Sequence, residues 1–239
     1  MGRLWGGIIA VAGITLWYYG GTRGETALVN LGIGTIILGL VLATMPSRGY
    51  VDRKTLPLTC TNLCGFLENL RRELNLKEKP LVIPPYENLP EGGIFIPESE
   101  NPIPRPGKFS RGRVLITGTP EESGLLLSPP PGWGIVEYAL ENVGELGGTG
   151  VGYASSVVSS VLSGLGIGSG EAFEGESGEV EVFVSPLCDG PFYADPIVSA
   201  MLLGVAMGRD EIMGVESAER VRGHWKIVLK PLGGIEKWL

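Results

Sequence analysis

Two long apolar stretches open the chain and form its strongest pattern. They run from Leu4 to Gly21 and from Ala27 to Met45, contain no charged residue, and are separated only by Thr22 to Thr26. A helix needs about 20 apolar residues to cross a hydrocarbon core of roughly 30 Å, and inside lipid its backbone must satisfy its own hydrogen bonds. The pattern therefore predicts a transmembrane helical hairpin over residues 1–46.

A cleavable signal peptide is the alternative for the first stretch, because Arg3 precedes its apolar core. The stretch lacks a small-residue cleavage site and runs directly into the second one, which favours the hairpin. Aromatic rings that suit the headgroup layer also lie near the span ends. These residues are Trp5, Trp17, Tyr18, Tyr19 and Tyr50.

Basic residues near the span ends predict the orientation, because they are retained on the cytoplasmic side. The turn offers only Arg23, which Glu25 offsets, whereas the outer ends carry Arg3, Arg48, Arg53 and Lys54. We therefore expect a multi-pass protein of the cell membrane, with its N-terminus and its soluble part in the cytoplasm.

Small residues recur along both stretches and would let two helices approach closely. They are Gly6, Ala10, Gly13, Gly32, Gly34 and Gly39. We interpret them as the interface between the two spans. A face for oligomerisation is the alternative.

Residues 47–118 are predicted to hold a juxtamembrane helix followed by a proline-rich strand region. Apolar residues at three- and four-residue steps indicate an amphipathic helix over Thr59 to Asn75, with Thr59 or Thr61 as its cap. Its polar face mixes both charges, so packing on the domain is favoured over a membrane-surface position. Eight prolines between Lys79 and Ser110 exclude helices there. They leave short or edge strands at Leu81–Ile83 and Ile94–Ile96.

The spacing Pro102-x-Pro104-x-Pro106 is typical of a stiff connector, with a polyproline II ligand as the alternative.

Residues 119–232 alternate short apolar runs with helical patterns, which predicts an α+β domain, and residues 233–239 form a C-terminal tail. The expected strands are Val114–Thr117, Leu125–Leu127, Val180–Val184, Ile212–Ser217 and Trp225–Leu229. The expected helices are Ile135–Val143, Tyr153–Leu162 and Ile197–Met207. Asp195-Pro196 supplies a cap and a first-turn proline to the last helix, whose body has almost no polar face. It is therefore expected to be a buried central helix.

One internal similarity suggests a pseudo-repeat of two strand-loop-helix units. Leu125–Leu127 runs into Ser128-Pro129, and Val182–Val184 runs into Ser185-Pro186. A glycine-containing loop and a helix follow each pair. Coincidence is the alternative, because Ser-Pro after a strand is common.

The amino-acid composition limits the kinds of molecule that we expect this protein to bind. The whole chain carries a net charge of −7, and the part beyond residue 50 holds 16 basic and 25 acidic residues. A domain with a net charge near −9 repels phosphate backbones, which excludes nucleic acid as the expected partner. Glutamine is absent and histidine and cysteine are scarce, a composition typical of heat-adapted proteins.

The candidate metal and cofactor motifs are incomplete. Cys60, Cys64, Cys188 and His224 form a zinc set on paper, but the short knuckle spacing is missing. We expect buried thiols and no metal or cofactor.

Gly164-x-Gly166-x-Gly168-x-Gly170 follows a helix and leads into glutamates, so it indicates a helix exit rather than a phosphate loop. The glycines from Gly147 to Gly152 precede a helix, but no Walker lysine follows them.

Catalytic patterns are equally incomplete. A thiol hydrolase would require His224 beside Cys188, and the serines from Ser155 to Ser163 lack a nucleophile motif. The acidic segment Glu171 to Glu181 lacks a calcium-loop pattern and indicates a solvated turn. The weak binding candidates are Cys188, Asp189, Gly190 and Asp195.

No motif identifies a family. The incomplete catalytic and cofactor motifs favour a protein that is not an enzyme. The pattern favours a membrane-anchored, cytoplasm-facing α+β domain that acts as a scaffold or accessory subunit, with a protein partner or a second copy. The alternative is a small-molecule-sensing module whose loops Pro129–Gly134 and Pro186–Gly190 line a pocket. A membrane-tethered cysteine or serine hydrolase is the second alternative.

Overall fold

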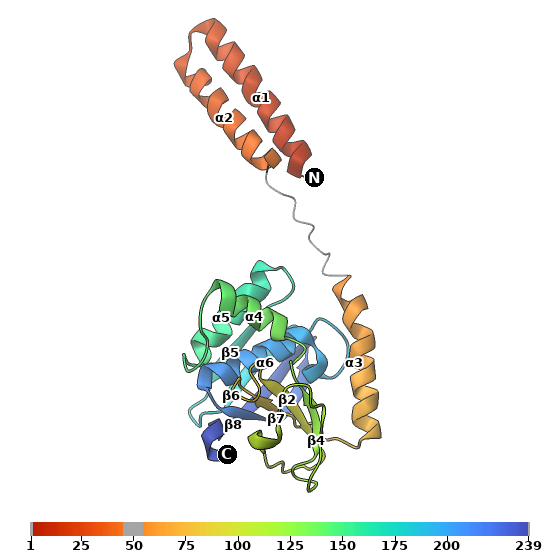
Figure 1. The fold of residues 1–239 in the computed structure, drawn as a ribbon. Helices are drawn as coiled ribbons and strands as arrows, with labels where there is room; N and C mark the ends of the chain where they lie inside the picture. The colour runs from red at the N-terminus through yellow and green to blue at the C-terminus, as the bar shows by residue number, and fades with distance from the viewer. Residues whose placement is uncertain (1, 45–54, 239) are drawn as a thin grey trace. The chain divides into compact units, whose positions relative to one another are not determined.

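The computed structural model describes residues 2–44 and 55–238 (Figure 1). Its contacts divide the chain into two compact units, Met1–Asp52 and Arg53–Leu239. The orientation prediction also used Arg48, Arg53 and Lys54, and the aromatic boundary included Tyr50; these four residues lie outside the described residues.

The N-terminal unit is a pair of helices, α1 (Gly2–Arg23) and α2 (Thr26–Thr44), that pack side by side as a hairpin (Figure 1). Glycines on each helix meet the backbone of the other, and a Cβ on Gly39 would lie 2.5 Å from the nitrogen of Ala10. Gly6, Gly13 and Gly32 make equally close approaches, whereas Gly34 faces open space. The interpretation of the small residues as the contact between the helices is confirmed, except at Gly34.

Among the described residues, one helix is long and apolar enough to cross a membrane. Its window, Thr26–Ala43, has a mean hydropathy of 2.1, and 11% of the window is buried. This criterion rests on length and composition alone, and it identifies α2 but not α1. A span formed by α1, and with it the two-span hairpin, therefore stays a prediction.

The second unit is built on one antiparallel sheet of eight strands, in the order β3-β4-β2-β1-β7-β8-β6-β5. The strands are β1 (Leu81–Ile83), β2 (Gly93–Pro97), β3 (Leu115–Ile116), β4 (Gly124–Leu127), β5 (Gly170–Glu174), β6 (Val180–Val184), β7 (Ile212–Val221) and β8 (His224–Gly233). The helices are α3 (Leu56–Glu73), α4 (Trp133–Asn142), α5 (Val151–Gly164) and α6 (Pro196–Arg209), with single 3-10 turns at η1 (Pro106–Lys108), η2 (Phe192–Ala194) and η3 (Ile235–Trp238). The predicted α+β class is confirmed.

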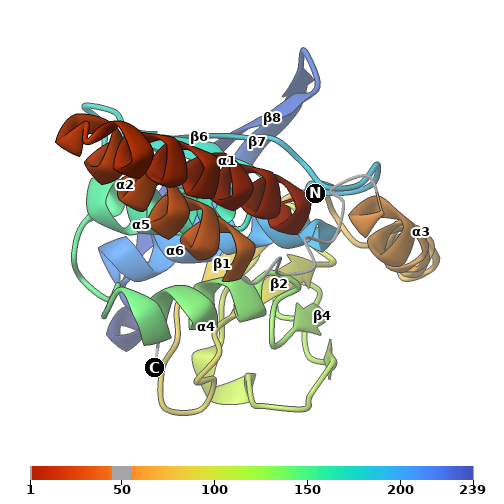
Figure 2. The same cartoon turned by 90° about the horizontal axis from the view of Figure 1, so that it is seen from above.

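Helix α6 is the centre of the main core. It contacts β1 and β6, and α4 and α5 pack against it (Figures 1 and 2). Every residue from Ile197 to Gly208 is buried. Asp195 caps the helix as predicted, since its Oδ1 accepts hydrogen bonds from the backbone nitrogens of Ile197 and Val198. The prediction of a buried central helix is confirmed.

A smaller core covers the opposite face of the sheet over β1, β2 and β4. Phe95 and Phe109 pack there with ring centroids 5.2 Å apart, and Ile235 and Trp238 of η3 lie against the same cluster. Ile235 and Trp238 of the segment predicted as a tail, residues 233–239, therefore contribute packing to this core. On the other half of the sheet the same face is more open, and Phe173 of β5 is exposed.

Several predicted elements differ from the structure. Helix α3 begins at Leu56, with Pro57 in its first turn, and the Thr61 hydroxyl donates to the Pro57 carbonyl inside the helix. Thr61 is therefore not a cap, because Pro57 already starts the helix upstream of it.

Strands β1 and β2 are short, as predicted, but both are paired on two sides rather than lying at an edge. The strand predicted at Val114–Thr117 shortens to β3, Leu115–Ile116.

The acidic segment predicted as a turn is the β5–β6 hairpin, with its turn at Gly178. The glutamates had indicated a solvated turn. They are instead compatible with a strand because β5 lies at the edge of the sheet, where charged side chains point into water. Glu171 and Glu174 are exposed, whereas Gly170 is buried and Ala172 is half-buried.

The two similar strand-loop-helix units occupy corresponding places in the sheet. Reading outward from the centre, β1-β2-β4-β3 on one side matches β7-β8-β6-β5 on the other, and every pair is antiparallel. Strands β4 and β6 each lie second from an edge, and each is followed by Ser-Pro and then by a helix, α4 or α6. The chain order differs between the halves, because the inner strands β1 and β2 precede the outer pair whereas β7 and β8 follow theirs. The pseudo-repeat therefore stays a prediction.

Candidate binding groove beside helix α3

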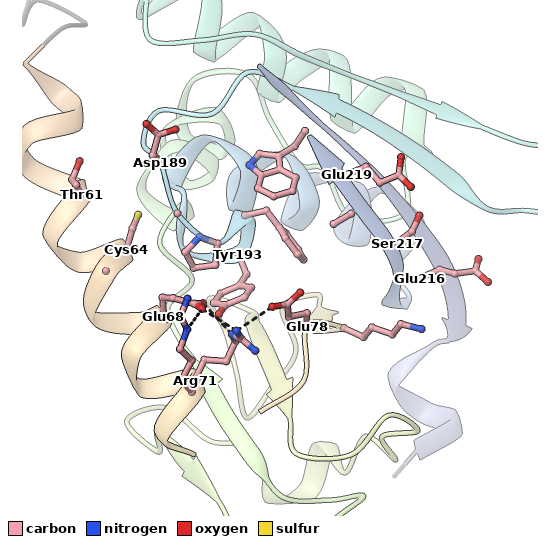
Figure 3. A pocket seen from close by; sticks show the side chains of 18 residues that line it. Thr61, Cys64, Glu68, Arg71, Glu78, Asp189, Tyr193, Glu216, Ser217 and Glu219 are labelled. Atoms are coloured by element: carbon pink, nitrogen blue, oxygen red, sulfur yellow. Dashed lines mark hydrogen bonds and ion pairs between the residues drawn. The ribbon is translucent and has the colours of Figure 1, made fainter. Parts of the chain in front are cut away.

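A cavity of about 750 Å³ opens between α3, the segment Asp189–Tyr193 and the outer half of the β7–β8 hairpin (Figure 3). We call this cavity the α3 groove. Thr61, Cys64, Glu68 and Arg71 line it from α3, and Glu216 to Glu219 line it from β7. A volume of this size is typical of sites for ligands or short peptide segments.

Helix α3 packs against the rest of the α+β domain through the face that carries its two cysteines. Cys64 is fully buried, and Cys60 and Leu67 join the same core. The Cys64 thiol lies 3.8 Å from the carbonyl oxygen of Ala194. A Cβ added at Gly190 would lie 2.7 Å from the Cβ of Cys64, so only glycine admits the helix this closely. The predicted packing of this amphipathic helix on the domain is confirmed.

Asp195 fixes the segment behind the groove. Its Oδ2 accepts hydrogen bonds from the backbone nitrogens of Leu187 (2.6 Å) and Cys188 (2.8 Å), while Oδ1 caps α6. The side chain is buried, and four N–H groups occupy its two oxygens. Asp195 therefore positions the loop and is not available to a ligand.

The four weak binding candidates separate into two pairs. Asp189 and Gly190 line the α3 groove, whereas Cys188 and Asp195 do not. The Asp189 side chain is 87% exposed and forms an ion pair of 2.7 Å with Arg220. An exposed pair of this kind contributes little stability, so Asp189 can exchange Arg220 for another cation.

The structure brings the three cysteines of the predicted zinc set together and leaves the histidine elsewhere. Cys60 and Cys64 both interact with the Cys188 thiol. His224 lines a separate cavity of about 420 Å³, and its neighbour Trp225 lines the α3 groove, as expected for successive residues of a strand that point to opposite faces. Across residues 2–44 and 55–238, no three His, Cys, Asp or Glu side chains are arranged to hold a metal ion.

The thiols lack the features of a nucleophile. Burial raises the pKa of Cys188 and of Cys64, and the nearby Asp195 carboxylate raises both further. An activated thiol needs the opposite shift.

A serine hydrolase arrangement is also incomplete. His224 shares its cavity with Ser159 and Ser169, but the Ser159 hydroxyl accepts a hydrogen bond from the Gly170 nitrogen at 3.4 Å. No hydrogen bond joins His224 to a serine within the described part of the chain. The pairing of nucleophile and base that such a mechanism requires is therefore not formed.

Charges on the α3 side of the groove are paired with one another. Glu68 forms ion pairs with Arg71 (2.9 Å) and Arg72 (2.7 Å), and Arg71 also reaches Glu78 at 3.0 Å (Figure 3). The hydrogen bond from Arg71 lowers the pKa of Glu68, so this carboxylate is ionised at neutral pH. Across the groove, Glu216 and Glu219 are exposed and form no ion pair with a described residue.

Aromatic side chains lie between these two walls. Phe192 packs edge to face against Trp225 (5.7 Å between centroids) and against Tyr193 (5.5 Å). Tyr193 is 1% exposed, and its hydroxyl makes no hydrogen bond to a described residue. Burial raises the pKa of Tyr193, so the hydroxyl keeps its proton and remains a donor without an acceptor.

The sequence did not indicate this groove, because its walls come from four segments that are distant in the sequence. They are residues 61–72, 78–79, 189–193 and 216–225. Only Asp189 and Gly190 were candidates in advance. The one local signal on the β7 side was the prediction of two strands, Ile212–Ser217 and Trp225–Leu229.

Comparisons with protein-family models, with curated proteins and with solved structures found no significant match to this chain.

Proposed function

We propose that this protein is an accessory subunit of a membrane assembly, in which the α1–α2 hairpin anchors a cytoplasmic α+β domain that binds a protein partner. The observation that carries the proposal is the uncovered apolar surface of α2. Large side chains such as Leu31, Ile37 and Leu38 are each more than half exposed, and little of the Thr26–Ala43 window is buried. Such a surface needs lipid or another protein to cover it.

The α3 groove supports binding rather than catalysis. Its one lining thiol, Cys64, is buried and has a raised pKa, and the Glu68 carboxylate at its centre is held by two arginines. Neither group is therefore poised as a nucleophile or general base. An aromatic floor between charged walls is instead the composition of a recognition surface.

A small-molecule-sensing module is the second candidate, and the size of the groove together with the unpaired Tyr193 hydroxyl favours it. The two glycine-containing loops do not share this cavity, however. Pro186–Gly190 contributes Asp189 and Gly190, whereas Gly132 of the other loop packs so closely on α6 that a Cβ would lie 2.3 Å from the Ala200 nitrogen.

Cross-linking in native membranes tests the proposal. Membranes that contain the full-length tagged chain are treated with a short amine-reactive cross-linker, solubilised in mild detergent and purified by the tag. We expect one protein to be recovered in stoichiometric amount, and to be recovered without cross-linker in reduced yield. Recovery of a monomer alone under both conditions would contradict the proposal.

A further inference from the structure

Half of strand β7 has an open edge. Strand β1 pairs with β7 only at Met213 and Gly214, and the last contact on this side is the hydrogen bond from the Val215 nitrogen to the Pro80 carbonyl (3.0 Å). A bulge between Val215 and Ser217 follows. Beyond the bulge, no strand among the described residues pairs with β7 on the side away from β8.

The hairpin register identifies which backbone groups this edge presents. Arg222 and Gly223 both have positive φ angles (51° and 87°) and form a two-residue turn between the paired Val221 and His224. Hydrogen-bonded pairs therefore fall at 221–224, 219–226 and 217–228, because they alternate along an antiparallel ladder. Ala218 and Arg220 must direct their N–H and C=O groups away from β8, toward the open edge.

The open edge of β7 forms one side of the α3 groove. Glu216, Ser217 and Glu219 lie along the side of the groove opposite α3, and Ala218 lines it as well (Figure 3). A segment placed beside β7 would thus lie between that strand and the helix. The groove therefore has the unpaired backbone groups that strand addition uses.

The two faces of an added strand would meet different chemistry. Ala218 and Arg220 pair with Ile227 and Trp225, so the face they share is continuous with the aromatic floor at Phe192 and Tyr193. Ser217 and Glu219 point to the opposite face. Lys226 lies across from Glu219 there but pairs with Glu181 at 2.9 Å, and neither Glu219 nor the neighbouring Glu216 forms an ion pair with a described residue. Apolar side chains suit the first face and basic side chains the second.

We propose that the α3 groove binds an extended segment of a partner protein with alternating apolar and basic side chains, which adds as a strand to the open edge of β7. The proposal rests on the proposed function, because it names where and how the partner binds. A second copy of this chain is not the occupant. If two β7 edges paired antiparallel with Ala218 opposite Arg220, Glu219 would face its own counterpart, and like charges facing each other oppose pairing.

Two labelled peptides test the chemistry of the groove on the full-length protein in a non-ionic detergent. One is Lys-Val-Lys-Val-Lys-Val and the other is Glu-Val-Glu-Val-Glu-Val, with binding followed by fluorescence anisotropy against protein-free micelles. We expect the basic peptide to bind at least about tenfold more tightly at low salt, because electrostatic complementarity selects it. Equal binding of the two peptides, or binding of neither, would overturn the proposal.

A matched pair of substitutions tests the geometry. Ala218→Pro removes an N–H that faces the groove and not β8, so the hairpin keeps its own hydrogen bonds. Ala218→Thr keeps the N–H. We expect the first to weaken binding of the basic peptide by about tenfold or more and the second to leave it within about threefold, since backbone hydrogen bonds supply the affinity in strand addition.

The double variant Glu216→Lys/Glu219→Lys provides a test that does not depend on the fold of the proline variant, because both side chains are exposed. It should prefer the acidic peptide. A folded Ala218→Pro protein with unchanged binding, or a charge-reversed protein that still prefers the basic peptide, would overturn the inference. If neither peptide binds but a partner is still recovered by cross-linking, strand addition fails and the accessory-subunit proposal stands.

Discussion

At the scale of single residues, Asp195 and Asp189 show how position decides the role of a carboxylate. Both belong to the segment behind the α3 groove, six residues apart. Asp195 is 1% exposed and accepts four backbone N–H groups, so it joins the loop at Leu187 and Cys188 to the start of α6. Asp189 is exposed and has one surface partner, Arg220. The first is a structural residue, and the second is available to a ligand.

Asp195→Asn should destabilise the α+β domain by about 2–4 kcal/mol, because an amide has one oxygen and would leave buried N–H donors at Leu187 and Cys188 facing its own NH₂ group. Urea unfolding followed by tryptophan fluorescence measures the change. The matched control, Asp189→Asn, should cost no more than about 1 kcal/mol, as expected of an exposed ion pair. Equal effects of the two substitutions would show that Asp195 does not organise the segment as described.

The buried thiols predict how stability changes at alkaline pH. Burial raises the pKa of Cys64 and of Cys188 above the ordinary value of 9.0. An acid whose pKa is raised on folding stabilises the folded state below its unfolded pKa, and this contribution is lost as pH rises above it. The free energy of unfolding should therefore fall between pH 9 and pH 10. Cys64→Ala should reduce this dependence.

Iodoacetamide labelling checks the same thiols directly. In the folded protein at pH 8 the three cysteines should react slowly, since all are buried, and in urea they should react as ordinary thiols. Rapid labelling of Cys188 in the folded protein would contradict its assignment as a protonated core residue and would revive the hydrolase alternative.

At the scale of elements, the sequence predicted those whose pattern is local. Strands β1 and β6 have the predicted bounds, Leu81–Ile83 and Val180–Val184, because short apolar runs between breakers leave few alternatives. Helix α6 was predictable from Asp195-Pro196 and an apolar body. In each case the residues that specify the element lie within it.

Elements and sites that depend on distant partners were not predictable in this way. Strand β5 is specified by its pairing with β6, and its glutamates alone resemble a solvated turn. The start of α3 was misplaced because two downstream threonines resembled caps. The α3 groove depends on the register of β7 and β8, on the bulge at Val215 and on the close contact of Cys64 with Gly190. A single sequence contains no signal for any of these features.

The glycines of the α1–α2 hairpin provide a test at the same scale. Gly39→Leu places a side chain where a Cβ already lies 2.5 Å from the Ala10 nitrogen, so the helices must separate. Gly34→Leu is the matched control on the same helix, because nothing lies within 4 Å of its Cβ position. Spin labels at the exposed positions Tyr18 and Leu31 report the separation by pulsed EPR. We expect a longer and broader distance distribution for Gly39→Leu and no change for Gly34→Leu.

At the scale of the whole molecule, the two units differ in the solvent that their surfaces require. Helix α2 exposes apolar side chains, whereas the part of the chain beyond residue 50 carries a net charge near −9 and has two apolar cores. An anionic domain avoids an anionic leaflet unless it is tethered there. In the proposed arrangement, the hairpin would supply this tether.

The number of spans and the orientation can be determined together. If both helices cross the membrane with the domain in the cytoplasm, epitope tags at the N-terminus and the C-terminus are both inaccessible from outside intact cells, and Glu25→Cys in the turn reacts with an impermeant maleimide. If α2 crosses alone, the N-terminal tag becomes accessible from outside while the C-terminal tag stays protected. Glu236→Cys is the control and should react only after permeabilisation, since the C-terminal turn belongs to the domain. Extraction of the protein by alkaline carbonate would contradict both arrangements, because a spanning helix resists it.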